Sequence, residues 1–472
     1  MSGFIGRQEQ LSALNALLEQ VRADIGTASP GKCLLMRGRR RVGKSRLAEV
    51  FVGSTRAPAL YFTASRQGKR ELDLFAEEAA ASNLPGANLF TGVTLTTWDA
   101  ALRTLAQALP SNEPAIVVVD EFPYLVERNA EVEATFQKQW DRLLSRKPAL
   151  LILIGSDLAM MEALDSHDRA FFQRGTEMVV PPLSPAETAS IVGAPGAAEG
   201  FDAYLLTGGL PLVCSEWQKG ARMWEYLNGA LANPTSALIV SAERSLVAEF
   251  PADALARDVL SQIGAGETTF TNIARAAGGL RAMSLNRALD LLTTKRIVTR
   301  DLPLSTKPSK EARYRVADPY LRFWLAFVAP HLAEIERGRS DRVLQRARDG
   351  WASWRGRAIE PIVREALLRL LPFKGLTGEA VGAYWARTNI PEVDLIGADR
   401  APTAHTVTFA GTVKWLENTP LDGADLNRLV ADASQVPGVG ATTPLVAVSR
   451  TGVSVKTAAV TLGPEDLMEA WS

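Results

Sequence analysis

The chain has 472 residues, of which 47% are hydrophobic and 22% charged, and its 52 basic side chains are balanced by 52 acidic ones. This length predicts two to four domains, and a formal charge of zero excludes a global field that attracts nucleic acid, so any such binding needs a local basic patch. Two cysteines and three histidines argue against a disulfide framework or a zinc site. With no signal peptide or membrane span recognisable, we expect a cytoplasmic protein without membrane contact.

The first element in the chain is an amphipathic helix. Gly6 and Arg7 precede it, and its leucines recur at helical spacing, at Leu11, Leu14, Leu17 and Leu18. Taken by itself, the Gly-Arg pair is interpretable as an ordinary capping turn.

The strongest motif follows this helix. The apolar run 33–36 predicts a short buried strand, residues 38–45 fit G-x-x-x-x-G-K-[ST], and helix-forming residues come next. This order is typical of a phosphate-binding loop, whose backbone amides and helix N-terminus surround the β-phosphate. Lys44 would reach the β- and γ-phosphates, and the Ser45 hydroxyl would ligate Mg²⁺. The predicted contacts with ATP or ADP in this segment are Gly38, Arg41, Val42, Gly43, Lys44, Ser45 and Arg46.

A pair of acids follows a second apolar run. Residues 115–119 are continuously apolar and mostly β-branched, which predicts a central strand of a parallel sheet. Asp120 and Glu121 follow at its carboxyl end, where such sheets bind ligands. We expect Asp120 to hold the Mg²⁺ shell and Glu121 to orient and deprotonate the attacking water.

Two further polar positions are candidates for the same site. A strand predicted at 150–154 is followed by Ser156, our choice for a polar residue between the acids and the γ-phosphate, with Asp157 as second choice. Arg174 precedes a strand predicted at 178–180. It is either a finger that stabilises transition-state charge, in cis or across a subunit boundary, or a surface residue.

A helical region begins after these strands. Ser184 is a candidate N-cap, and Glu187 completes a capping box. The region contains the Gly-Gly-Leu-Pro turn 208–211, which as a bare turn needs no function.

The pattern changes again from about residue 254 to residue 318. Three short helices and two extended segments are predicted there, at 256–263, 270–277, 284–293, 297–301 and 313–316. This order indicates a winged helix, which either places its third helix in the DNA major groove or serves only as a lid or docking surface. The basic side chains available for phosphate contacts are Arg281, Arg287, Lys295, Arg296, Lys307 and Lys310.

The last hundred or so residues form a further unit. A helix predicted from Gly356 to Leu371 contains Glu360. A strand predicted at 390–397 carries acids at alternate positions, and a second strand, predicted at 407–414, ends in a lysine.

Together these segments resemble the archaeal-type ATPases of the STAND/AAA+ group that carry a fused carboxyl-terminal domain. The resemblance covers nearly the whole chain and rests on the Gly6-Arg7 pair, the phosphate-binding loop, and the segments VVVDEFPYL, GGLP, RYRVADPYLRFWLAFV, PEVDLIG and VKW. It implies that Gly6 and Arg7 belong to a box that cradles the adenine. It also implies that Pro211, in a helical lid, rests near the adenine.

The same resemblance implies a tail with the PD-(D/E)xK nuclease fold. In that fold a helix Glu, a strand Asp and an acid-x-Lys segment hold Mg²⁺ and activate water. The matching positions are Glu360, Asp394 and Lys414. Thr412 stands where the further acid is expected, and a hydroxyl is a poor replacement for a charged Mg²⁺ ligand. Glu392 or Glu417 could compensate, but we expect weak or absent nuclease activity.

The expected fold is α/β: a P-loop NTPase parallel sheet with a helical lid, a winged helix and a restriction-endonuclease-like domain. The predicted domains are an ATPase core at 1–183, a lid at 184–250, a winged helix at 251–330, a connector at 331–355 and the nuclease-like domain at 356–472. We expect an ATP-hydrolysing switch that uses Mg²⁺ and has a DNA-related output. The alternatives are a nucleotide-bound, non-hydrolysing module for DNA or a protein partner, and an ATP-gated nuclease; assembly into a homo-oligomer is open.

Overall fold

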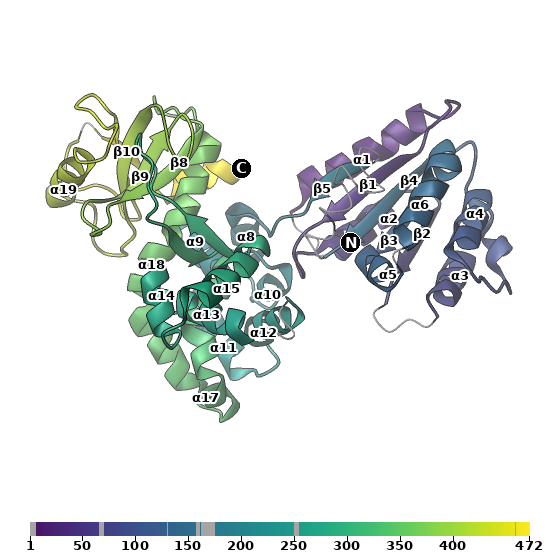
Figure 1. The fold of residues 1–472 in the computed structure, drawn as a ribbon, viewed down its shortest axis with the longest axis horizontal. Helices are drawn as coiled ribbons and strands as arrows, with labels where there is room; N and C mark the ends of the chain where they lie inside the picture. The colour runs from purple at the N-terminus through teal and green to yellow at the C-terminus, as the bar shows by residue number, and fades with distance from the viewer. Residues whose placement is uncertain are drawn as a thin grey trace. The chain divides into compact units, whose positions relative to one another are not determined.

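A computed structural model describes residues 6–65, 70–129, 131–156, 161, 175–249, 254–457 and 459–472. The chain divides into two compact units, Met1–Pro182 and Leu183–Ser472, and most of their helices and strands are labelled in Figure 1. None of the helices in the described ranges is both long and apolar enough to cross a lipid bilayer.

The first unit is built on a parallel five-stranded sheet. The strand order is β2-β3-β4-β1-β5, and every pairing is parallel. Because β4 lies between β1 and β3, the carboxyl ends of these three strands stand side by side. The strands are β1 (Lys32–Arg37), β2 (Ala59–Thr63), β3 (Ala115–Asp120), β4 (Ala149–Gly155) and β5 (Thr176–Val179). The predicted fold class is confirmed, although β5 begins two residues earlier than the strand predicted there.

Helices cover both faces of this sheet. α1 (Gln8–Ala23) and α2 (Lys44–Ser54) pack on one face, and α3 (Glu71–Ala81), α4 (Trp98–Ala108) and α6 (Glu131–Arg142) cover the other. α5 (Phe122–Arg128) follows β3 directly.

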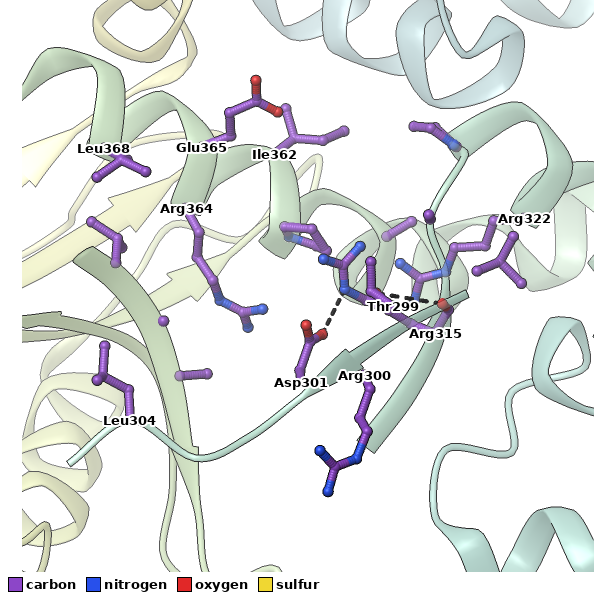
Figure 2. A pocket seen from close by; sticks show the side chains of 18 of the residues that line it. Thr299, Arg300, Asp301, Leu304, Arg315, Arg322, Ile362, Arg364, Glu365 and Leu368 are labelled. Carbon is purple, nitrogen blue, oxygen red and sulfur yellow. Dashed lines mark hydrogen bonds and ion pairs between the residues drawn. The ribbon is translucent and has the colours of Figure 1, made fainter. Parts of the chain in front are cut away.

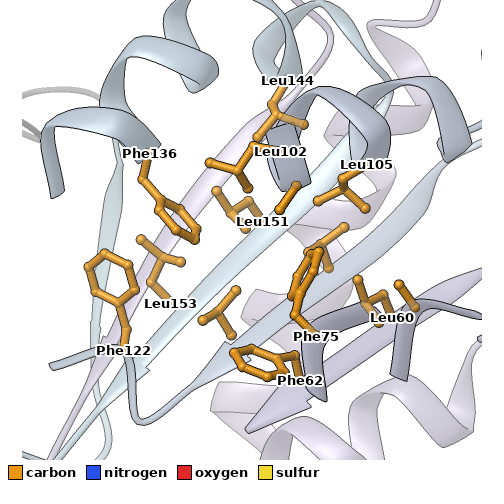
Figure 3. Packing of buried hydrophobic residues seen from close by; sticks show 14 of the residues in the cluster. Leu60, Phe62, Phe75, Leu102, Leu105, Phe122, Phe136, Leu144, Leu151 and Leu153 are labelled. Carbon is orange, nitrogen blue, oxygen red and sulfur yellow. The ribbon is translucent and has the colours of Figure 1, made fainter. Parts of the chain in front are cut away.

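Leucine and phenylalanine side chains fill the core beneath α3, α4 and α6, as Figure 3 shows. Phe62 meets Phe75 edge-on with centroids 5.3 Å apart, and Phe122 meets Phe136 at 5.1 Å. Such pairs contribute about 0.5–1.5 kcal/mol each beyond area burial. This packing fixes β2, β3 and β4, whose ends carry the candidate site.

The second unit begins with short helices. Their bounds are α8 (Pro185–Val192), α9 (Ala197–Thr207), α10 (Pro211–Ser215), α11 (Met223–Ala232) and α12 (Ala237–Glu249). The predicted capping box is confirmed, because the Ser184 hydroxyl accepts from the Glu187 amide and the Glu187 carboxylate accepts from the Ser184 amide. Gly209 has a φ of +65°, and a Cβ there would lie 2.1 Å from the Leu183 carbonyl oxygen, so only glycine fits this turn.

The three helices and the hairpin predicted next are present. They are α13 (Ala254–Gly264), α14 (Phe270–Ala276), α15 (Ala282–Thr294) and the antiparallel pair β6 (Val298–Asp301) and β7 (Arg313–Val316). The aromatic segment then forms α16 (Pro319–Phe323) and a π-helical turn, Trp324–Val328. It packs internally: the Trp324 indole donates to the Ile239 carbonyl at 2.9 Å.

A single long helix follows α17 (Leu332–Glu336). The prediction of a helix starting at Gly356 is wrong, because α18 runs without a break from Ser340 to Leu370 and contains Pro361. The arginine-rich segment before Gly356 concealed an apolar stripe that includes Val343, Ala347 and Trp351, all buried. The boundary predicted at 355/356 therefore falls inside a helix.

The chain ends in a mixed sheet of order β12-β11-β10-β9-β8. Its strands are β8 (Ala380–Trp385), β9 (Glu392–Ala398), β10 (Val407–Lys414), β11 (Leu445–Ser449) and β12 (Val460–Leu462). The first three strands pair antiparallel and the last three parallel, with α19 (Gly423–Ala433) between β10 and β11. α20 (Pro464–Met468) closes the chain.

A buried charge cluster joins the helical start of this unit to its end. The Asp202 carboxylate of α9 accepts from Arg355 of α18 at 3.1 Å and from Arg450, just after β11, at 2.9 Å. The side chains of these residues are 8%, 1% and 8% exposed. Glu417 also pairs with Arg355, at 2.7 Å. The cluster fastens α9 to both α18 and the C-terminal sheet.

Candidate functional site

The loop after β1 has the backbone that anion binding requires. Arg41 and Gly43 have φ values of +67° and +91°, and α2 begins at Lys44 directly after them. A Cβ at Gly38 would lie 2.4 Å from the Val180 carbonyl oxygen, so the loop entrance admits only glycine. The amides of the first turn of α2 are left without helical partners and point along the positive end of the helix dipole.

The Lys44 side chain folds back over this loop. It is 7% exposed, and its Nζ donates to the carbonyl oxygens of Gly38 at 2.8 Å and Arg39 at 2.9 Å. Burial lowers the pKa of Lys44 to about 8, while the charges of Glu121 and Asp120 oppose that shift. The ammonium group therefore lies in the electrostatic field of both acids.

The two acids at the end of β3 are held by different partners. Asp120 is 3% exposed, and its carboxylate accepts from the Tyr61 hydroxyl and from the Glu121 amide, each at 2.9 Å. Glu121 has a φ of +54°. For a residue with a side chain this conformation costs about 1–3 kcal/mol and often marks functional sites.

Ser156 lies next to Glu121. Its hydroxyl donates to the two Glu121 carboxylate oxygens at 3.0 and 3.3 Å, and its exposure is 5%. Because β4 separates β1 from β3, Ser156 stands between the loop and the acids. The chain thus brings Lys44, Asp120, Glu121 and Ser156 to one edge of the sheet.

The residues present fit Mg²⁺ bound together with a nucleotide. Ser45 lies in the first turn of α2, and Asp120 offers a buried carboxylate at the same sheet edge. Within the described ranges, no group of three or more His, Cys, Asp or Glu side chains could hold a metal ion alone. Mg²⁺ is commonly held by one or two protein groups, with phosphate oxygens and water as its other ligands.

The remaining predicted nucleotide contacts are placed unevenly. Arg7, with a φ of +65°, donates to the Val42 carbonyl at 2.9 Å and is 4% exposed. It therefore braces the phosphate loop, and Gly6 precedes it with a φ of +80°. The Arg46 side chain is 67% exposed and pairs with Glu49, so only its backbone amide remains a candidate contact.

Three predicted positions gain no placement in this site. Pro211 is the first residue of α10 in the second unit, and its approach to the adenine stays a prediction. Arg174 and Asp157 lie outside the described residues, so the arginine finger and the second-choice polar residue also stay predictions.

Sequence reasoning missed Tyr61. Its hydroxyl bonds the Asp120 carboxylate, and burial followed by the Asp120 charge raises the pKa of Tyr61, which keeps it a donor. A signal existed: Tyr61 is two residues before Thr63, which pairs with Asp120 across β2 and β3, so Tyr61 lies on the same face of the sheet. Only the strand pairing reveals that signal.

The nuclease-like residues are only partly assembled. Burial raises the pKa of Glu360 to about 7 against the opposing charge of Arg364, and burial also raises the pKa of Asp394. Arg364 pairs with Glu360 at 2.7 Å and donates to the Asp394 carbonyl at 2.9 Å. Thr412 and the Val413 amide both donate to the Oδ2 atom of Asp394, at 2.9 Å each.

Lys414 takes no part in this pair of acids. Its ammonium group donates to Asp425 at the start of α19. A PD-(D/E)xK site needs the lysine beside the reacting water. The geometry therefore disfavours cleavage.

Comparisons with known proteins give distant likenesses. Residues 324–426 match a family described as "Archaea bacterial proteins of unknown function". An uncharacterized protein of Methanocaldococcus jannaschii is 25% identical over 410 residues, which cover 83% of this chain and 84% of that protein. The nuclease assignment gains no support from either match.

Two solved structures are similar in outline. The Walker-type ATPase of Pyrococcus abyssi is 20% identical with a TM-score of 0.47, covering 68% of this chain and 96% of that one. The ORC2 protein of Aeropyrum pernix, in ADPNP–ADP complexes, is 14% identical with a TM-score of 0.44, covering 74% and 98%. At these scores the likeness shows nothing about the ligands or partners of this chain.

Proposed function

We propose that the protein binds ATP at the loop between β1 and α2 and hydrolyses it. The observation that carries this proposal is the contact between Ser156 and Glu121, at the sheet edge where the phosphate loop and Lys44 also lie. A phosphate loop alone could merely bind an anion. A carboxylate held by a neutral donor at the same sheet edge adds a base that can accept a proton from water.

Each residue has a defined task in this proposal. The loop amides and Lys44 hold the β- and γ-phosphates. Glu121 takes a proton from the attacking water. At the same time the water oxygen bonds to the γ-phosphorus, and the bond between the γ-phosphorus and the β–γ bridging oxygen breaks. Bound Mg²⁺, held by Ser45 and Asp120, would neutralise developing charge on the phosphates.

We further propose that hydrolysis acts as a switch with a DNA-related output through the second unit. The cluster of Asp202, Arg355 and Arg450 supports transmission within that unit, since it ties the lid helix α9 to the C-terminal sheet. Assembly with further copies or with a protein partner is compatible with this switch.

Two variants test the hydrolysis. Lys44→Ala should abolish both ATP binding and turnover, whereas Glu121→Gln should keep binding and lower kcat by about 10²–10⁴-fold. Phosphate release and calorimetry at saturating Mg²⁺ are the measurements. Wild-type turnover equal to that of Lys44→Ala would refute hydrolysis.

A specific observation favours a second candidate, a nucleotide-bound module that barely hydrolyses. Both acids already have protein partners, Tyr61 for Asp120 and Ser156 for Glu121, and turnover requires these contacts to loosen. Nucleotide that copurifies and survives dialysis, combined with turnover unaffected by Glu121→Gln, would favour this module.

A further inference from the structure

Two neighbouring cavities run along one side of the winged helix in the second unit. The first has a volume of about 660 Å³ and lies among β6, β7, α18 and β8; the second, about 280 Å³, lies at β7, the start of α14 and the end of β8. Both are lined by Arg300 and Trp385, so they adjoin at these two side chains, and we call the pair of cavities the wing groove.

The wing groove concentrates positive charge. Seven cationic side chains but only three acidic ones line it: Arg300, Lys310, Arg313, Arg315, Arg322, Arg364 and Arg387 against Asp301, Glu311 and Glu365. Two further acids pair with these cations from outside the lining, Glu392 with Arg313 and Glu360 with Arg364. The remaining excess is a local basic patch on a chain that is neutral as a whole, and phosphate binding needs such a patch.

Several of these cations are crowded together. Figure 2 shows the guanidinium groups of Arg315 and Arg364 directed into the space around Asp301, with Arg315 bonded to Asp301 at 2.7 Å. Burial, followed by the charge of Arg315, lowers the pKa of Arg322 to about 10. An anion in this space would relieve that crowding.

Other cations of the groove are open to solvent. Arg300 points away from the Asp301 group in Figure 2 and is exposed, as is Lys310. Arg387 is 88% exposed and lies 4.0 Å from Glu311. Exposed, weakly paired cations along a groove suit successive phosphates of a flexible strand.

Apolar and aromatic lining alternates with this charge. Phe270 is half-buried in the second cavity, and Leu368, 44% exposed, lines the first. Leu304 and Ile362 form the floor of the first cavity and are 2% and 6% exposed. Proteins that bind single strands combine a basic groove with such surfaces for unstacked bases, whereas a duplex keeps its bases inside.

The third helix of the winged helix is a weaker candidate for nucleic-acid contact. Within its bounds α15 carries one cation, Arg287, and one acid, Asp290, and its N-cap and C-cap are Arg281 and Lys295. Its most exposed apolar residue is Met283, 85% exposed. The helix and its caps therefore offer fewer cations to a phosphate backbone than the wing groove does.

We propose that a single strand of nucleic acid lies in the wing groove, its phosphates on the arginines and its bases against the apolar lining. This inference deepens the DNA-related output proposed above. Arg364 also pairs with Glu360, so the strand passes beside the nuclease-like acids without needing them to cleave it.

The test is fluorescence anisotropy with a labelled oligothymidylate of about 20 nucleotides and a duplex of equal length. The groove variant is Arg300→Glu with Lys310→Glu, and the matched control is Arg281→Glu with Arg287→Glu at α15. We expect the groove variant to weaken strand binding at least about tenfold and to reduce the salt slope by about 1.4, for two lost phosphate contacts. The control should bind as wild type does.

Each other outcome overturns the groove. If only the α15 control variant loses strand binding, or if duplex binding depends on α15, the DNA-related output is retained but the wing groove is rejected as its site. If polyglutamate displaces the labelled strand as well as unlabelled oligothymidylate does, the groove binds any polyanion and the assignment to nucleic acid is rejected. No binding of either probe rejects both the groove and the DNA output, while the ATPase assays stand separately. Should the double variant melt below wild type by circular dichroism, the single variant Arg387→Glu decides, because that side chain is 88% exposed.

Discussion

Replacing Asp202 by alanine is the sharpest test of how the second unit is held together. The substitution removes the carboxylate that neutralises Arg355 and Arg450, whose side chains are 1% and 8% exposed. It leaves two buried guanidinium groups whose remaining acidic partners are more exposed: Glu417 for Arg355, at 2.7 Å, and Glu199 for Arg450, at 3.7 Å. Removing one partner from a buried ion pair destabilises by about 3–5 kcal/mol.

The assay is urea unfolding followed by tryptophan fluorescence. Eight of the ten tryptophans lie after residue 182, so the signal reports mainly the second unit, and the two units are free to unfold in separate transitions. The matched control is Glu365→Ala, which removes the 2.9 Å pair with Arg369 on exposed α18 surface. Such a pair contributes at most about 1 kcal/mol. Equal losses in the two variants would refute the claim that the cluster holds α9 in place.

The same residue predicts a pH dependence. Burial raises the pKa of Asp202 to about 6 from 3.8, although both arginines oppose the shift. The folded state therefore binds this proton more tightly than the unfolded chain does. The stability that comes from the bound proton is complete below about pH 4 and is lost as the pH rises through about 6. Relative to Asp202→Asn, the wild type should gain stability as pH falls from 7 to 4. A pH-independent difference would contradict the assignment.

Four further outcomes are expected. Ser156→Ala should lower kcat for ATP hydrolysis about 10–100-fold, the value of one hydrogen bond to a charged group, with nucleotide Kd unchanged; an equal rise in Kd would indicate a binding role instead. Nucleotide affinity should fall as pH rises above about 8, by up to tenfold per unit, because neutral Lys44 cannot attract phosphate; a flat profile by calorimetry would contradict this. Gly38→Ala should destabilise the first unit by about 1–3 kcal/mol and abolish nucleotide binding, whereas Gly53→Ala, where a Cβ meets nothing within 4 Å, should be neutral or stabilising in thermal melts. Asp394→Ala should leave any Mg²⁺-dependent DNA cleavage unchanged, and a loss of cleavage would show that the tail is a nuclease.

Local patterns in the sequence predicted the elements of the site well. Three elements of the site are recognisable from about ten consecutive residues each: the phosphate loop, the strand before Asp120 and the strand before Ser156. The two strands are recognisable because buried parallel strands are continuously apolar. The Ser184 capping box is local in the same way. These features need no knowledge of distant parts of the chain.

Contacts between distant segments escaped prediction. Tyr61 is 59 residues from Asp120, and Arg450 is 248 residues from Asp202, so neither pairing leaves a local trace. Lys414 was assigned to the acid pair because its spacing fitted, yet Asp425 at the start of α19 takes its ammonium group. A motif fixes which residues are present, while the competing partners are set by tertiary packing.

The bond from Arg7 to the Val42 carbonyl makes the segment ahead of the sheet part of the apparatus that grips phosphate. A bulky fusion attached just before this arginine would break that bond and leave the loop amides less ordered. Ordering them again on binding would cost free energy and weaken the binding of every anion that the loop accepts. Affinity handles for biochemical work are therefore better attached after α20, and a shortened chain that lacks Arg7 should serve as a deliberately loosened loop against which nucleotide affinity can be compared.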